Sequence, residues 1–197
     1  MTTYQPNLRA FVTVLVIVSI GIVALIEKVP LSAEYESYRS LIVPSTIVSI
    51  VWVLWIIFDR FLWKWRVSRL FGLSNQPDLN GIWVGDIDRL GEENPHQFKM
   101  EIYQTFSKIS IATRTEHSSS HSIRAYFLSD QHNKRFELVN LWSCRTKKRQ
   151  KTEAFEEFKG LSQIAILDDN GSVILEDYYF TDRIPPTAGK SRLVRSP

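Results

Sequence analysis

The sequence predicts two N-terminal transmembrane α-helices followed by an all-β domain, an eight-stranded antiparallel β-barrel with one short helix. Three observations lead to this fold class. Two long stretches near the N-terminus carry no charged side chain, short segments after residue 80 alternate between apolar and polar residues, and turn-forming residues separate those segments. We therefore expect a membrane anchor over residues 1–71, a linker over 72–80 and a ligand-binding barrel over 81–197.

The two predicted membrane spans cover residues 10–26 and 41–58. Each stretch is uncharged and would be roughly 26 Å long as a helix, enough to cross a bilayer. A pair of buried core helices is the alternative, but both stretches are apolar on all sides and leave no face for water. A cleaved signal peptide is another alternative for the first stretch, although only Arg9 precedes it as a basic residue and no small-residue cleavage site follows.

The distribution of lysine and arginine predicts the orientation of these spans. More basic residues precede the first span and follow the second than lie between the two. Both termini should therefore face the cytoplasm, in a multi-pass protein of the bacterial inner membrane. The lone Cys144 fits a reducing compartment, because a single cysteine cannot close an internal disulfide.

Eight segments of the C-terminal region have the alternation of β-strands. They are 81–88, 98–106, 108–114, 121–128, 136–145, 161–167, 172–181 and 192–195. The connections are short and rich in hairpin residues, which indicates antiparallel neighbours. A closed barrel explains the lack of helices to cover an open sheet, and a sandwich is the alternative. The one predicted helix of this region runs from Thr152 to Lys159 and stops at Gly160.

Alternation also predicts which side chains point into the barrel. They are Trp83, Gly85, Ile87, Met100, Ile102, Gln104, Ile109, Ile111, Thr113, Phe136, Leu138, Asn140, Trp142, Leu175, Asp177, Tyr179, Thr181 and Arg183. Most are ordinary core residues. We expect the polar group Gln104, Asn140, Trp142, Tyr179, Thr181 and Arg183 to converge at one barrel end, where a small ligand would bind.

Residues typical of catalysis or metal binding have simpler explanations. His117 and His121 flank a serine turn, so we expect a solvated loop and no metal site. The acidic pair at 168–169 belongs to a two-residue hairpin with Asn170-Gly171 and not to a calcium loop. The sequence has no glycine-rich phosphate loop, no nucleophile elbow and no partner set that would activate Cys144. We therefore predict that the chain is not an enzyme and has no cofactor.

The densest run of positive charge covers Arg145 to Lys151. Such a run is by default a solvated loop. It would also suit contact with anionic lipid or electrostatic guidance of a phosphate ligand. The sequence leaves these interpretations open.

Five alternate residues of the penultimate strand form the most specific motif. They are Leu175, Asp177, Tyr179, Thr181 and Arg183. In one interpretation, Arg183 pairs with a phosphate, Thr181 donates to it, and Tyr179 or Trp142 stacks on a base. In the other, Arg183 closes the barrel end by covering an aromatic ring.

The layout resembles a known family of antiphage effectors. The motif from Asp78 to Gly85, which contains Gly81-Ile82-Trp83, follows the two predicted spans, and Tyr179-Phe180-Thr181-Asp182-Arg183 precedes Thr187 and Gly189. This combination is similar to the CBASS effectors that join two transmembrane helices to a β-strand-rich receptor domain, the CD-NTase-associated barrel receptors. The similarity covers nearly the whole chain, although Gly-x-Trp also begins lipocalin-like barrels.

The resemblance implies a function and a site. In that family the cytoplasmic barrel binds a cyclic dinucleotide from a partner nucleotidyltransferase, and the membrane segments then oligomerise and damage the inner membrane. It also implies that Tyr179, Thr181 and Arg183 occupy the pocket. The sequence departs from the family pattern at Asp177, where a small glycine is expected, and at Phe158-Lys159-Gly160, where His-x-Gly is common. Both departures concern ligand identity more than fold.

A cyclic dinucleotide has two negative charges and two base faces, so its pocket needs about two cationic or N–H donors and two aromatic platforms. The candidate ligand-binding residues are Tyr103, Asn140, Trp142, Tyr179, Thr181 and Arg183, with the 147–151 loop as a further source of charge. Expected partners are this ligand, a lipid bilayer and further copies of the chain, but no polymeric nucleic acid. The alternatives are a membrane-tethered lipocalin-like barrel that binds a lipid or other apolar ligand, and a phosphodiester-hydrolysing enzyme.

Overall fold

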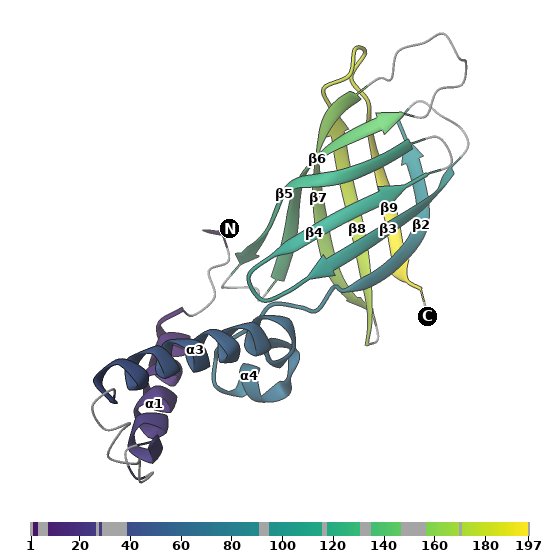
Figure 1. Ribbon diagram of the computed structural model, residues 1–197. Coiled ribbons are helices and arrows are strands. Elements are labelled where there is room, and N and C mark those ends of the chain that lie inside the picture. Colours follow the sequence, from purple (N-terminus) through teal and green to yellow (C-terminus); the bar gives the residue numbers. More distant parts are fainter. Residues whose placement is uncertain are drawn as a thin grey trace. The chain divides into compact units, whose positions relative to one another are not determined.

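Figure 1 shows the computed structural model. It describes residues 2–3, 8–26, 28, 39–90, 95–115, 118–130, 135–146, 157–169 and 171–196. The chain forms two compact units, one of residues Gln5–Asn75 and one of Met1–Tyr4 together with Gln76–Pro197. The expected linker over 72–80 is thus divided between the two units, and its residues from Gln76 onward belong with the β-strands.

The first unit is helical. It contains α1 (Leu8–Ile26), α3 (Arg39–Arg60), a 3-10 turn η1 (Leu62–Lys64) and the short α4 (Arg66–Leu70). Helices α1 and α3 cover the two uncharged stretches of the sequence. Among the described residues, however, we find no helix with both the length and the apolar character that a membrane crossing requires, so the structure does not support the two expected transmembrane helices.

The second unit is an eight-stranded antiparallel barrel, as the sequence predicts. Its strands are β2 (Gly81–Arg89), β3 (His96–Gln104), β4 (Ile109–Arg114), β5 (Ser118–Asp130), β6 (Arg135–Thr146), β7 (Glu157–Asp169), β8 (Ser172–Thr181) and β9 (Ala188–Arg195). Each strand pairs with the next, and β9 pairs with β2 to close the barrel. A two-residue strand, β1 (Thr2–Thr3), extends the pairing of β5. Closure excludes the alternative sandwich (Figure 1).

The barrel interior follows the predicted alternation. On β3, for example, every second residue from Phe98 to Gln104 is buried and the residues between them are exposed. The most buried side chains, at most 1% exposed, come from all around the barrel: Leu79, Trp83, Met100, Ile111, Leu138, Ile164, Leu175 and Leu193. Leu79 precedes β2, so the segment before the first barrel strand also contributes a side chain to the core.

The hairpin between β7 and β8 has the predicted geometry. Asp169 at the end of β7 pairs with Ser172 at the start of β8, which leaves a connection of two residues. Gly171 has a φ of 86°, a left-handed conformation that favours glycine, and its N–H donates to Oδ1 of Asp168 at 2.9 Å. The carboxylate of Asp168 therefore stabilises the turn.

The predicted helix from Thr152 to Lys159 is wrong over its last three residues. Glu157, Phe158 and Lys159 begin β7 and pair with Arg145, Cys144 and Ser143 of β6. Ladder hydrogen bonds to β6 outweigh the local helical pattern there. The remainder of the predicted helix, 152–156, lies outside the described residues.

One end of the barrel is sealed by Gln104. Its side-chain oxygen accepts from the Leu79 N–H at 2.8 Å, and its Nε2 donates to the Pro77 carbonyl at 2.9 Å. Beside it, Nε1 of Trp83 donates to the Leu79 carbonyl at 2.9 Å, and the Arg195 guanidinium lies 4.9 Å from the centre of the Trp83 ring. This end is therefore filled by the segment before β2.

Candidate functional site

A cavity occupies the other end of the barrel. Its volume is about 80 Å³, and it is partly open to solvent. Strands β2, β3, β4, β5, β6, β7 and β8 and the segment that follows β8 all contribute to its lining. Because seven of the eight barrel strands contribute to the lining, the site is assembled by barrel closure and not by any one hairpin.

Five of the six candidate ligand-binding residues line this cavity: Asn140, Trp142, Tyr179, Thr181 and Arg183. The sixth, Tyr103, does not. It is 61% exposed and lies outside the barrel, because alternation along β3 places it opposite its inward neighbours Ile102 and Gln104. Gln104, which we also expected at the mouth, is at the sealed end, since β3 runs from the cavity end toward Gln104.

Three aromatic rings form one wall of the cavity. The Trp142 ring contacts Phe158 and Tyr179 edge-on, with ring centres 6.0 and 6.3 Å apart. Glycine makes room for this arrangement. A Cβ at Gly160 would lie 2.2 Å from Cζ2 of Trp142, and one at Gly189 would lie 2.8 Å from the Tyr179 hydroxyl. The absence of side chains at these glycines therefore sets where the tryptophan and tyrosine rings lie.

Arg183 covers one of these rings. The centre of its guanidinium lies 4.5 Å from the centre of the Phe158 ring. This contact supports the interpretation in which Arg183 caps the barrel end. It is compatible with phosphate binding, because a guanidinium that stacks through its face keeps its N–H donors in the plane of the group.

Thr181 holds the segment that carries Arg183. Its hydroxyl lies 2.7 Å from the hydroxyl of Thr187 and accepts from the Thr187 N–H at 3.1 Å. Its own N–H donates to the Thr187 carbonyl at 2.9 Å. At the same turn, Oδ1 of Asp182 accepts from the Lys159 N–H at 2.7 Å. Thr181 thus lines the cavity and also fixes the turn after β8.

The inner wall of the cavity is polar. Asn140, Ser162 and Asp177 come from the adjacent strands β6, β7 and β8 and are 3–4% exposed. Burial raises the pKa of Asp177 from 3.8 to about 7, and the hydrogen bond from Ser162 opposes that rise only in part. The wall therefore contains a carboxyl group that changes protonation close to neutral pH.

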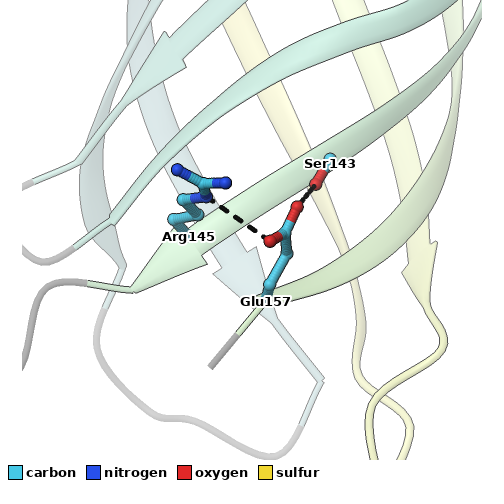
Figure 2. Close-up of polar contacts among 3 residues, drawn as sticks. All are labelled: Ser143, Arg145 and Glu157. Atoms are coloured by element: carbon cyan, nitrogen blue, oxygen red, sulfur yellow. Dashed lines mark hydrogen bonds and ion pairs between the residues drawn. The ribbon is translucent and has the colours of Figure 1, made fainter. Parts of the chain in front are cut away.

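The basic run is represented among the described residues by Arg145 alone, because 147–151 lies outside them. Figure 2 shows Arg145 beside Glu157, with Nε of the arginine 3.4 Å from a carboxylate oxygen. The Ser143 hydroxyl donates to the other oxygen at 3.0 Å. This hydrogen bond, followed by the charge of Arg145, holds the pKa of Glu157 below its ordinary value. All three belong to the face of β6 and β7 that points away from the interior.

The predicted solvated histidine loop is only partly described. His117 lies outside the described residues. The expected turn over 118–120 is wrong, because these serines begin β5 and pair with β6; His121 follows them and is exposed on the same strand. Among the side chains that the structure describes, no group of three or more His, Cys, Asp or Glu is placed to hold a metal ion. The cavity is therefore characterised by stacking surfaces, arginines and buried polar groups.

Several cavity residues were not among the sequence candidates. Arg89 continues the inward series of β2 beyond Ile87, so extending the alternation by one step would have found it. Ser162 and Phe158 face inward on β7, whose inward face the sequence analysis did not assign. Asp177 was placed inward but not at the site, because only the paired strands show that it lies beside Ser162, which in turn pairs with Asn140.

These features place the protein among closed up-and-down barrels that are sealed at one end and have a polar cavity at the other. Comparison with known proteins is more specific. Residues 74–195, most of the chain, match the family described as Cap15, cyclic dinucleotide receptor domain, and the chain belongs to this family. The resemblance to barrel receptors of CBASS effectors is thereby confirmed.

A curated relative agrees with this assignment. The chain is 31% identical over 74 residues to CD-NTase-associated protein 15 of Staphylococcus schleiferi. The aligned part covers 37% of this chain and 40% of that protein. The chain thus spans less than half the length of this relative.

Proposed function

We propose that this chain is the effector of a CBASS antiphage system and that its barrel cavity binds a cyclic dinucleotide. The observation that carries the proposal is the convergence of Trp142, Tyr179 and Arg183 in one cavity, within the region that matches the receptor family. A nucleotide offers π faces for the rings and anionic phosphates for arginine. Arg89 supplies a second cation at the same cavity.

Calorimetric titration of the full chain with a panel of cyclic dinucleotides tests this proposal. We expect Arg183→Ala and Tyr179→Ala each to weaken binding of the tightest ligand roughly tenfold or more, because charge-assisted hydrogen bonds and base stacking each contribute more than 1 kcal/mol. Exposed neighbours serve as matched controls: Arg192→Ala on β9 and Tyr178→Ala on β8 should bind as the unaltered chain does. Equal ligand affinity in all four variants would exclude this cavity as the binding site.

A membrane-tethered barrel for a lipid remains the second candidate, favoured by the apolar side chains of Ile87, Phe98 and Met100 in the lining. It predicts fatty-acid binding that survives Arg183→Ala.

The receptor proposal also treats the ligand as a signal and not as a substrate. Chromatography after prolonged incubation should therefore recover the dinucleotide unchanged, and its hydrolysis would indicate an enzyme.

The response to the ligand is the finer part of the proposal. We infer that binding drives assembly of several copies and that the N-terminal helices then disrupt the bacterial inner membrane. The uncharged stretches at 10–26 and 41–58 support this inference. Cells that contain the chain and a ligand-producing nucleotidyltransferase should take up an impermeant dye and yield cross-linked oligomers of the chain. Cells that contain the Arg183→Ala variant instead should show neither effect. Ligand binding without assembly or dye entry would refute this part alone.

A further inference from the structure

Two oxygen atoms on the inner wall of the cavity receive no hydrogen bond from the residues that the structure describes. Asn140 pairs in register with Ser162, Ser162 pairs with Tyr179, and Asp177 lies two residues before Tyr179 on the same face of β8. Three polar side chains therefore lie side by side across β6, β7 and β8, and each is more than nine-tenths buried. Barrel cores are normally apolar at such depth, so this row requires an explanation.

A short relay satisfies part of the row. Nε1 of Trp142 donates to the Ser162 hydroxyl at 3.0 Å, and that hydroxyl donates to Oδ2 of Asp177 at 3.5 Å. Two side-chain oxygens of the row take no part in this relay. Within the described part of the chain, no group donates to Oδ1 of Asp177 or to Oδ1 of Asn140. A buried acceptor without a donor destabilises the folded state, so a ligand that supplies two donors here would recover free energy on binding.

The chemistry of the two oxygens selects the kind of ligand group. A phosphate carries acceptors and negative charge, so the buried carboxylate of Asp177 would repel it. The row of polar side chains is therefore expected to contact a nucleobase, while Arg89 and Arg183 are suited to bind the phosphates. Guanine carries two adjacent donors, N1–H and N2–H2, on one edge. Adenine and cytosine place an acceptor beside their amino group, and uracil has one N–H between two carbonyls.

We propose that Asp177 and Asn140 form a guanine-reading wall, in which Oδ1 of Asp177 accepts from N1–H and Oδ1 of Asn140 accepts from the N2 amino group. This inference rests on the proposed function and adds the base that the site selects. Trp142 and Tyr179 border the row, so the same base can contact an aromatic ring while its edge meets the two oxygens.

The protonation of Asp177 adds a readout that a purely structural role would not give. The ionised carboxylate accepts a hydrogen bond at Oδ1, whereas the protonated form does so less well. The strands beside Asp177 present Ser162 and Ser191 to it, and the other titratable or charged cavity groups are Arg89, Cys144, Tyr179 and Arg183. Affinity for a guanine ligand should therefore fall as the pH is lowered from 8 to 6.

Calorimetry with the full chain and three probes tests the wall: cyclic di-GMP, its inosine analogue, which lacks only the N2 amino groups, and cyclic di-AMP. We expect cyclic di-GMP to bind at least tenfold more tightly than either of the others. Asp177→Asn should reduce this preference and remove its pH dependence. Glu176→Gln makes the same chemical change on the adjacent residue, outside the inward face, and should keep both.

The outcomes separate the two proposals. Tight binding of dinucleotides with equal affinity for cyclic di-GMP and its inosine analogue would overturn the guanine wall and leave the receptor function intact. A preference unchanged by Asp177→Asn would also overturn it. Failure of all three probes, and of mixed-base cyclic dinucleotides, to bind would overturn both. The inosine comparison needs no substitution, so misfolding of a variant cannot obscure the result.

Discussion

Asp177 carries a carboxyl group at a place that water hardly reaches, since the residue is 4% exposed. A buried carboxylate is stabilised only by hydrogen bonds or by an opposite charge, and the Ser162 hydroxyl is a single, long partner at 3.5 Å. The folded protein therefore favours the protonated form, with the pKa of Asp177 raised to about 7. The site thus has a stability cost at neutral pH in the absence of a ligand.

This cost predicts a pH dependence of stability. The unfolded chain releases the Asp177 proton near pH 3.8 and the folded chain near pH 7, so the folded state binds more protons between these values. The free energy of unfolding should therefore contain a contribution that falls as the pH rises from about 4 to about 7, by at most about 1.4 kcal/mol per pH unit. Urea unfolding of the full chain at several pH values measures this slope.

Asp177→Asn supplies the comparison, because the amide does not titrate. The variant should lose this contribution and be more stable than the unaltered chain at pH 8. Glu176→Gln should retain the slope. A slope that persists unchanged in Asp177→Asn would show that another group causes it.

At the scale of the element, β7 determines the shape of the cavity. Three of its inward residues surround the Trp142 ring. Phe158 contacts the ring, Gly160 leaves room for it, and the Ser162 hydroxyl accepts a hydrogen bond from its Nε1. The position of the Trp142 ring thus depends on three successive inward positions of one neighbouring strand. Helical propensity before Gly160 predicted a different structure, because it ignores the pairing with β6.

Gly160→Ala should displace the Trp142 ring. The added Cβ would lie 2.2 Å from Cζ2 of the ring, so the ring must move and its hydrogen bond to Ser162 must weaken. We expect a loss of about 1–3 kcal/mol in the free energy of unfolding and weaker ligand binding. Lys159→Ala on the exposed side of β7 is the control. Urea unfolding and calorimetry measure both effects, and unchanged ligand affinity in Gly160→Ala would contradict this account.

For the whole molecule, barrel closure brings the site together. Strand β2 pairs with β9, so Trp83 lies opposite Arg195, which is more than a hundred residues away along the chain. On the same strand β2, Ile87 and Arg89 line the cavity together with residues of β6, β7 and β8. The same closure separates the two ends. Gln104 seals one of them with the segment before β2, and the aromatic and arginine residues surround the other.

Much of this architecture was predictable from local signals. The alternation of residues and the hairpin residues predicted all eight strands of the barrel, including 172–181 with the observed bounds. Five of six candidate site residues also lie in the cavity, because their strands were assigned correctly and their inward face follows from period two. Tyr103 lies outside the cavity for the same reason, because its position along β3 alternates with the buried residues of that strand.

The number of barrel strands, their antiparallel order and most of their inward residues follow from the amino-acid sequence, since they depend on neighbours a few positions apart along the chain. The folded barrel was needed to show which end is sealed, that Gln104 and Arg183 lie at opposite ends, and that Asn140, Ser162 and Asp177 form one row. These relations depend on the stagger of the strands, which sets the residues that share a level and arises only when the entire sheet closes.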